Sequence, residues 1–173
     1  QKESYQDGNY LRGSVKATVN IKPVEGLRVS GFAAFEEGDN RKFWFNKTIN
    51  TDIENSGKAG RGSDFNVSKL FEVTADYSHT FGRHHVAAVA GISYQNFLYD
   101  GQEISNKGFP TEAMKYYQIG NGDAEKTYLG ASSYRNSNTL AAGFARVNYS
   151  YAEKYLASVS LRREGSSRFG VNN

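Results

Sequence analysis

The chain has 173 residues and no cysteine, which excludes disulfides and thiolate metal sites. Its 21 basic and 18 acidic residues are scattered, so the net charge of +3 does not come from the basic stripe of a nucleic-acid-binding surface. No run of 18 apolar residues is present, which excludes a membrane-spanning helix but not a membrane barrel, whose strands alternate in polarity. The 18 Gly, 12 Tyr and 11 Phe favour strands joined by tight turns.

The first expected element is a hairpin. Apolar residues or glycines alternate with polar residues over 11–21, and the same period of two returns over 27–35 after a short turn at 22–26. The polar stretch that follows, 36–64, shows no sustained alternation, so we expect a long loop there.

A second hairpin is expected next. Alternation covers 65–77, interrupted only by Lys69, and it returns over 86–94 after a short turn around Gly82. The segment 98–137 contains several glycines and turn dipeptides, which predicts a second long loop.

The third hairpin lies near the end of the chain, where 141–151 and 155–161 alternate on either side of a turn at 152–154. The sequence therefore predicts an all-β fold, an antiparallel meander of six strands in neighbour order. The expected strands are 10–21, 27–36, 65–80, 85–97, 138–151 and 155–163.

Connections that alternate between short and long are typical of outer-membrane barrels, which have short periplasmic turns and long extracellular loops. The strands offer about 9–11 alternating residues, the length that a tilted strand needs to cross the hydrocarbon layer. Tyrosines on the apolar faces near the short turns suit an interfacial girdle: Tyr77, Tyr149, Tyr151 and Tyr155. One lipid-facing surface is expected to hold Leu11, Val15, Val19, Leu27, Val29, Val73, Ala88, Ile92, Val147 and Val159.

The opposite faces carry too many charges for the dry interior of a small barrel. These charges are Arg12, Lys16, Arg28, Glu72, Asp76 and Arg146. A wet or plugged lumen fits them better. An open six-stranded sheet would also leave unpaired edges in lipid, so we expect further strands outside this chain, and any secretion signal upstream of it.

The third hairpin contains sequence motifs that are specific enough to compare with known families. It runs Ala145-Arg146-Val147-Asn148-Tyr149-Ser150-Tyr151, then Glu153-Lys154-Tyr155-Leu156, then Arg162-Arg163-Glu164-Gly165-Ser166-Ser167-Arg168-Phe169-Gly170. These motifs resemble the SusC/RagA family of TonB-linked outer-membrane transporters, with Glu164 in place of the usual Asp. The resemblance covers roughly residues 10 to 170, except for the two expected loops.

The resemblance implies that residues 1–173 are part of a 22-stranded transmembrane barrel. It also implies an amino-terminal plug, a SusD-like surface lipoprotein as partner, and energy from TonB acting through a region that is not in this chain. The expected function is import of glycans or peptides across the outer membrane of a Gram-negative bacterium, without catalysis. In that setting the barrel contacts outer-membrane lipid and an oligosaccharide or peptide substrate.

The candidate ligand contacts lie in the two expected loops. Phe43, Trp44 and Phe45 form the densest aromatic group, and Tyr116 and Tyr117 follow Met114 in the second loop. Aromatic faces on an outward loop can stack on a sugar or hold a partner, and packing within the loop is the competing interpretation.

No catalytic, metal or cofactor site is expected. Ser166 and Ser167 lack the surroundings of a hydrolase nucleophile, and a structural turn that fixes the strand exit is favoured for them. His84 and His85 are adjacent, so they point to opposite faces of a strand, and packing at the turn or interface is favoured over chelation of one metal ion.

Two alternatives remain open from the sequence. One is an unrelated outer-membrane porin or adhesin, which would share the strands but not the motif from Arg162 to Gly170. The other is a secreted soluble β-sandwich that binds carbohydrate, with Trp44 as its stacking residue.

Overall fold

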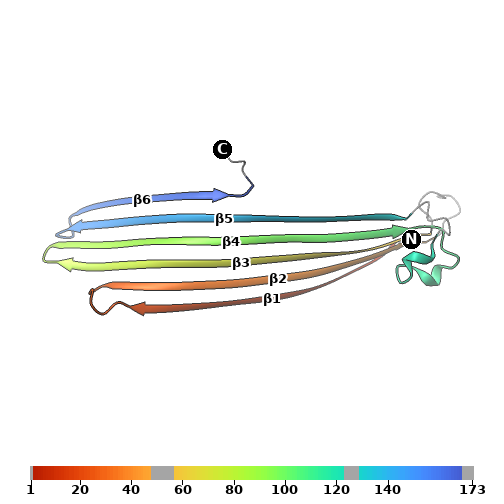
Figure 1. The fold of residues 1–173 in the computed structure, drawn as a ribbon, viewed down its shortest axis with the longest axis horizontal. Helices are drawn as coiled ribbons and strands as arrows, with labels where there is room; N and C mark the ends of the chain where they lie inside the picture. Colours follow the sequence, from red (N-terminus) through yellow and green to blue (C-terminus); the bar gives the residue numbers. More distant parts are fainter. Residues whose placement is uncertain (1, 48–56, 123–128, 169–173) are drawn as a thin grey trace. The chain divides into compact units, whose positions relative to one another are not determined.

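The computed structural model describes residues 2–47, 57–122 and 129–168, and it is an antiparallel meander, as expected (Figure 1). One six-stranded sheet has the order β1-β2-β3-β4-β5-β6. The strands are β1 (Lys2–Asn20), β2 (Leu27–Asn46), β3 (Lys58–Phe81), β4 (His84–Asn106), β5 (Gly130–Tyr151) and β6 (Tyr155–Ser166). Two 3₁₀ helices, η1 (Glu112–Met114) and η2 (Ile119–Asn121), lie between β4 and β5. Within the described ranges, no helix has the length and apolar character needed to cross a membrane.

The strand ends at the long connections differ from expectation. The expected loop at 36–64 is wrong in extent, because β2 continues to Asn46 and β3 begins at Lys58. The expected loop at 98–137 is also too long, because β4 continues to Asn106 and β5 begins at Gly130. Strand β1 likewise begins at Lys2 instead of residue 10. Polar and aromatic side chains are mixed on both faces of these extensions, so backbone pairing continues where the regular alternation of polarity has ended. Residues 48–56 and 123–128 of the expected loops lie outside the described residues.

The short turns lie where the alternation placed them. In the first turn the Ile21 amide donates to the Leu27 carbonyl at 2.9 Å, and Gly26 has a φ of 83°. A Cβ at Gly26 would collide with the Ser78 carbonyl, so only glycine fits. The third turn is built differently, because the non-glycine residues Ala152 and Glu153 have φ values of 51° and 59°.

The chain divides into two compact units. Unit 2 contains Arg12–Glu36, Ser68–Phe97 and Ser137–Asn173. In it, Val147 pairs with Val159 across β5 and β6, so both side chains share one face. Arg146, Arg162 and Glu164 belong to the opposite face by the same register. Val15 and Val159 are exposed by 67% and 73%, so these expected lipid-facing residues are not packed against a second sheet.

Aromatic side chains gather at the short-turn ends of unit 2. The His79 ring lies 4.3 Å from Phe81 and 6.3 Å from Tyr77, measured between centroids. On β5 and β6, the rings of Tyr151 and Tyr155 are 6.4 Å apart. Such a band suits the interface between lipid and water.

The motif after β6 has the structural role that the sequence favoured. The Ser167 hydroxyl accepts a hydrogen bond from the Thr139 amide at 2.9 Å, and the Ser167 amide donates to the Thr139 carbonyl at 3.0 Å. Ser167 therefore fastens the end of β6 to β5. Phe169 and Gly170 of the motif lie outside the described residues.

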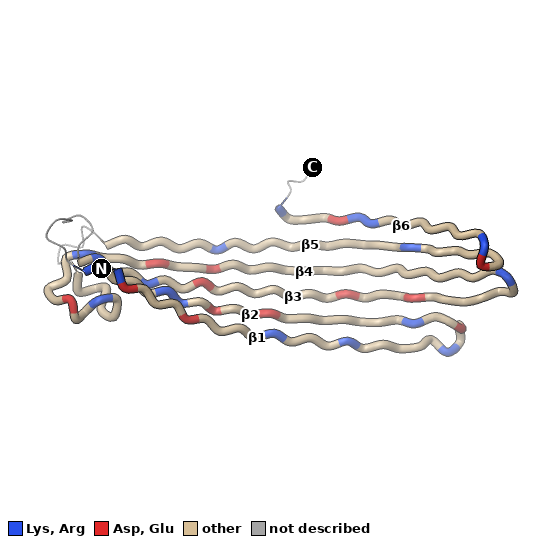
Figure 2. Tube along the Cα trace, turned by 180° about the vertical axis from the view of Figure 1, so that it is seen from behind, with Lys and Arg blue, Asp and Glu red and all other residues tan. Residues whose placement is uncertain are grey.

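Unit 1 contains Gln1–Leu11, Glu37–Val67 and Leu98–Asn136. Its core consists of Phe45 and Ala59, both fully buried, and Ile119 from η2. The partly buried side chains of Phe109 and Tyr116 pack against this cluster. The segment that carries η1 and η2 is thus held on one face of the strands. Along the described strands, Lys and Arg are interspersed with Asp and Glu (Figure 2).

Candidate ligand-binding surface

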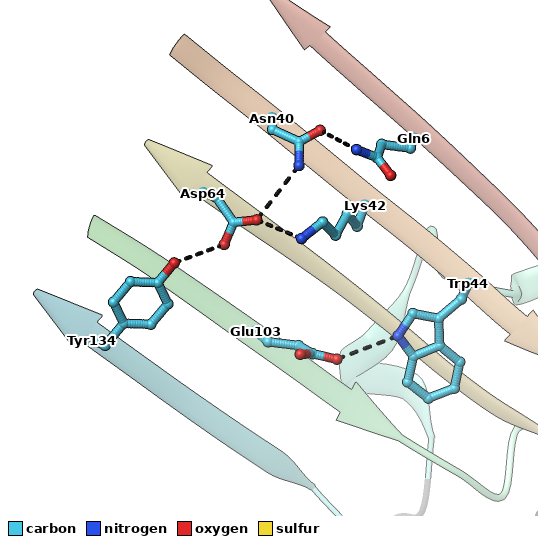
Figure 3. A network of polar contacts seen from close by, with 7 residues as sticks. All are labelled: Gln6, Asn40, Lys42, Trp44, Asp64, Glu103 and Tyr134. Carbon is cyan, nitrogen blue, oxygen red and sulfur yellow. Dashed lines mark hydrogen bonds and ion pairs between the residues drawn. The ribbon is translucent and has the colours of Figure 1, made fainter. Parts of the chain in front are cut away.

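A network of polar contacts converges on Asp64 in unit 1 (Figure 3). The Lys42 ammonium donates to Asp64 Oδ2 at 2.7 Å, and the Tyr134 hydroxyl donates to Asp64 Oδ1 at 3.1 Å. Asn40 Nδ2 reaches Asp64 Oδ2 at 3.5 Å, and Gln6 Nε2 donates to Asn40 Oδ1 at 3.0 Å. These side chains come from four strands, β1, β2, β3 and β5, and they point to the same face of the sheet.

Trp44 lies on this face, and a hydrogen bond fixes the edge of its indole ring. Its Nε1 donates to Glu103 Oε1 at 3.4 Å (Figure 3). The Lys58 ammonium lies 5.9 Å from the centroid of the Trp44 ring. A Cβ added to Gly60 would collide with the indole, so the ring packs directly on the backbone of β3. The side chains of Gln6, Asn40, Lys42, Trp44, Asp64, Glu103 and Tyr134 define the surface that we call the network face.

The contact between an aromatic ring and a glycine recurs on the network face. A Cβ at Gly101 would lie 2.6 Å from Tyr134, and a Cβ at Gly38 would lie 2.9 Å from Tyr10. In each pair the missing side chain lets the ring lie close to the neighbouring strand. The glycines of these strands therefore hold the aromatic rings against the sheet.

Two hollows lie on the network face. The larger, of about 650 Å³, is lined by residues that include Gln6, Tyr10, Asn66 and Tyr99. The smaller, of about 140 Å³, is lined by residues that include Trp44 and Glu103. Asp64 and Tyr134 line both hollows, so the two adjoin at the centre of the network.

The central charges stabilise each other. The hydrogen bond from Lys42 holds the pKa of Asp64 below its ordinary value, and the same bond raises the pKa of Lys42. Donation to Asp64 also raises the pKa of the Tyr134 hydroxyl. All three groups belong to the strand extensions, outside the segments whose alternation predicts a membrane crossing. Near neutral pH the network therefore holds an ion pair and a protonated tyrosine.

The three aromatic candidates of the first expected loop lie on two different faces of β2, because side chains alternate along a strand. Phe45 is fully buried in the unit 1 core. Phe43 lies 6.0 Å from the Tyr5 ring and 5.4 Å from the Tyr116 ring, with Arg61 over its own ring at 5.4 Å. Trp44 lies between them in sequence and projects to the other face, because successive side chains of a strand alternate.

The two tyrosine candidates of the second expected loop have different surroundings. Tyr116 packs on the core cluster, whereas Tyr117 is 67% exposed and its ring lies 4.6 Å from Tyr116. The structure thus gives Phe43, Phe45 and Tyr116 packing roles and leaves Trp44 facing the network.

Sequence reasoning missed the other members of the network face. Gln6 and Asn40 are 34 residues apart in sequence, and Asp64 and Tyr134 are 70 apart. Only the register between strands brings them together. A usable signal is the glycine-rich run from Gly57 to Gly62, whose Gly60 accommodates Trp44.

The histidines have local partners. His84 Nδ1 lies 2.6 Å from the Tyr149 hydroxyl, and His85 Nδ1 lies 2.9 Å from the Thr80 hydroxyl. Within the described ranges, no three His, Cys, Asp or Glu side chains are grouped to hold a metal ion.

Comparison with known proteins extends these findings. No protein-family model matches the chain. The chain is 29% identical to TonB-dependent receptor P3 of Formosa agariphila over 171 residues, which cover 90% of this chain and 17% of the relative. It is 23% identical to TonB-dependent receptor SusC of Bacteroides thetaiotaomicron over 157 residues, which cover 91% of this chain and 14% of the relative. The chain therefore spans about one sixth of the length of these curated relatives.

The fold has a match among solved structures. The RagAB peptide transporter superposes with a TM-score of 0.84 at 22% identity, over 99% of this chain and 19% of the matched chain. The fold of this chain is therefore the fold of a segment of that matched chain. The chain is thus similar in sequence to TonB-dependent receptors, including SusC, and similar in fold to a segment of the RagAB peptide transporter. TonB-dependent receptors are outer-membrane proteins of Gram-negative bacteria, and the matched relatives bear the names of receptors and transporters.

Proposed function

We propose that the complete protein is an importer in the outer membrane, and that residues 1–173 supply part of its barrel wall. The observation that carries this proposal is the two-sided sheet of unit 2. Exposed apolar residues such as Val15, Val147 and Val159 mark one face, and paired charges mark the other. On the charged face, Arg12 pairs with Glu36 at 3.1 Å. A wall between lipid and an aqueous lumen needs this division.

The cargo and partners follow from the family. We propose import of glycans or peptides, captured with a SusD-like lipoprotein and driven by TonB through a region that is not in this chain. The peptide transporter among the structural matches supports peptides as cargo, and glycans are the other cargo that the sequence resemblance implies. No catalytic step is proposed.

The network face is proposed to line the path of the cargo. Its residues belong to the even-numbered series of β1, β2, β3 and β5 and the odd-numbered series of β4. The same series supply the charged residues Arg12, Glu72 and Arg146 that are expected to face the lumen. The network face is therefore a candidate ligand contact in the wall, with Trp44 as the retained sequence candidate.

The test is deletion of the full-length gene in its host bacterium, followed by growth on single polymeric carbon or nitrogen sources. We expect growth to be lost on one class of glycan or peptide and kept on the corresponding monomers. Deletion of TonB should cause the same loss. Unchanged growth on every glycan and peptide supplied would contradict the importer assignment.

A further inference from the structure

The ligand of the network face can be specified by its chemistry. Resting on the proposed import function, we infer that this face binds a neutral oligosaccharide across its two adjoining hollows. Trp44 and Tyr134 serve as stacking platforms, and Asp64 with its neighbouring amides binds hydroxyl groups.

The two rings are built as platforms. Each packs on a glycine of the neighbouring strand, Trp44 on Gly60 and Tyr134 on Gly101, so one side of each ring is supported by backbone. Tyr134 is still 50% exposed. The Trp44 edge is fixed by its bond to Glu103, and the Lys58 ammonium lies at the outer limit of a cation–π contact. Rings held flat in this way present an apolar face, which suits the C–H face of a sugar ring.

Polar side chains that can bind sugar hydroxyl groups line the hollow beside the two rings. Asn40, Asn66 and Gln6 line the larger hollow, and each amide both donates and accepts hydrogen bonds, as a sugar hydroxyl does. The larger hollow, at about 650 Å³, lies within the usual range of roughly 300–1,000 Å³ for small-molecule sites. Because the smaller hollow adjoins it at Asp64 and Tyr134, a ligand of several sugar units can contact both platforms.

The charges of the network face favour a neutral ligand. Lys42 and Lys58, whose ammonium lies over the Trp44 ring, balance Asp64 and Glu103, so these four charges sum to zero. Lys42 and Asp64 already form an ion pair at 2.7 Å, and Glu103 accepts from Trp44. A charged ligand would have to break one of these contacts, whereas hydroxyl groups can join them.

The position in the sheet argues against a peptide. A peptide that binds by strand addition needs an exposed sheet edge, and the edges of the described sheet are β1 and β6. Both platforms and Asp64 come from the inner strands β2, β3 and β5. They offer side chains on a face and no free backbone ladder.

The test uses the full-length receptor, purified in detergent and titrated by calorimetry. The probes are neutral heptasaccharides of glucose, mannose, xylose and fructose, a heptamer of galacturonic acid, and a tryptic digest of casein. We expect a neutral heptasaccharide to bind and Trp44→Ala to weaken it about tenfold, as expected for loss of an aromatic contact. Gly60→Val should cause a similar loss, because its side chain displaces the indole. Trp44→Phe, which keeps a ring, should lose less.

Tyr5→Ala is the matched control. Tyr5 is an exposed aromatic residue of unit 1 that contacts Phe43 on the opposite face, so its removal should leave sugar binding unchanged. Heat-modifiable mobility shows whether each variant forms the barrel. Binding of only the acidic heptamer or the peptides, no binding of any neutral heptasaccharide, or wild-type affinity in a folded Trp44→Ala receptor would each overturn the inference. Growth that depends on the gene for peptides alone would overturn it too, while leaving the importer function intact.

Discussion

Asp64 shows how one residue can organise a surface. Three donors reach its carboxylate, from Lys42, Tyr134 and Asn40, and none of them is its neighbour in sequence. The Lys42 side chain is 53% exposed, so the ion pair adds little to global stability. Its main effect is to orient the side chains between the two hollows.

The ion pair gives the network a defined pH dependence. The pKa of Asp64 is lowered in the folded state, so its contribution is present above the unfolded value near about 4 and is lost as pH falls through the folded pKa. The pKa of Lys42 is raised, so its contribution is lost only at alkaline pH above about 10.4. We expect the wild-type receptor, solubilised in detergent, to melt at a higher temperature than the Asp64→Asn variant, by an amount that is constant between these two pH limits. This difference in melting temperature should shrink below the acidic limit and above the alkaline limit. A difference that grows on acidification would contradict the ion pair.

The turn between β5 and β6 places two ordinary residues in a conformation that favours glycine or asparagine. Ala152 and Glu153 both have positive φ, the requirement of a type I′ hairpin. Ala152→Asn with Glu153→Gly should stabilise the hairpin by about 1 kcal/mol, because the left-handed conformation costs L-residues about that much. Unfolding of the full-length barrel in urea measures the gain. Gly26→Ala in the first turn is the opposite control and should destabilise, since the added Cβ would collide with the Ser78 carbonyl at a position that already has a positive φ.

At the scale of elements, glycines and aromatic rings pair across neighbouring strands. Besides the pairs on the network face, Phe144 of β5 lies over Gly91 of β4 in unit 2. Such a pair fits only in one register, because a shift of one residue moves the ring to the other face of the sheet. The pairs therefore help to align strands whose polar ends carry no alternation.

Gly91 allows a matched test of this role. A Cβ at Gly91 would lie 2.6 Å from Phe144 and 2.9 Å from the Val73 carbonyl, whereas a Cβ at Gly143 meets nothing within 4 Å. We expect Gly91→Val to reduce the amount of heat-modifiable barrel in isolated membranes and Gly143→Val to leave it near wild type. Equal yields for the two variants would show that Gly91 is not needed for packing.

At the scale of the whole molecule, the two faces of unit 2 should respond differently to charge. Val15→Arg or Val147→Arg in the full-length protein should impair barrel assembly, since a charge on the lipid face near the midplane costs about 2–4 kcal/mol. Asp76→Asn and Arg146→Gln should assemble normally and at most alter uptake, because a water-lined wall tolerates polar exchange.

Two measurements check this asymmetry. Heat-modifiable mobility of membrane-extracted protein reports assembly, and growth on the imported nutrient reports transport. Equal tolerance of arginine on both faces would contradict the membrane orientation. It would favour the soluble β-sandwich, although the described strands form one sheet and not two packed sheets.

The sequence by itself determined the order of the strands, their antiparallel meander and the three short turns. Alternation with a period of two occurs where one face of the sheet is apolar and the other polar. In unit 2 it therefore predicts the face on which each side chain lies. The motif from Arg162 to Gly170 also pointed to a resemblance to the SusC/RagA family, and the similarity to TonB-dependent receptors and to the RagAB transporter confirms that resemblance.

The tertiary structure alone decided the ends of the strands at the long connections and the members of the network face. Where both faces mix polar and aromatic side chains, no alternation marks a strand, yet the backbone ladder continues through it. The separation of Trp44 from Phe43 and Phe45, and the meeting of Asp64 with Tyr134 across 70 residues, depend on strand register. Register is a property of paired strands, so no single segment of sequence contains it.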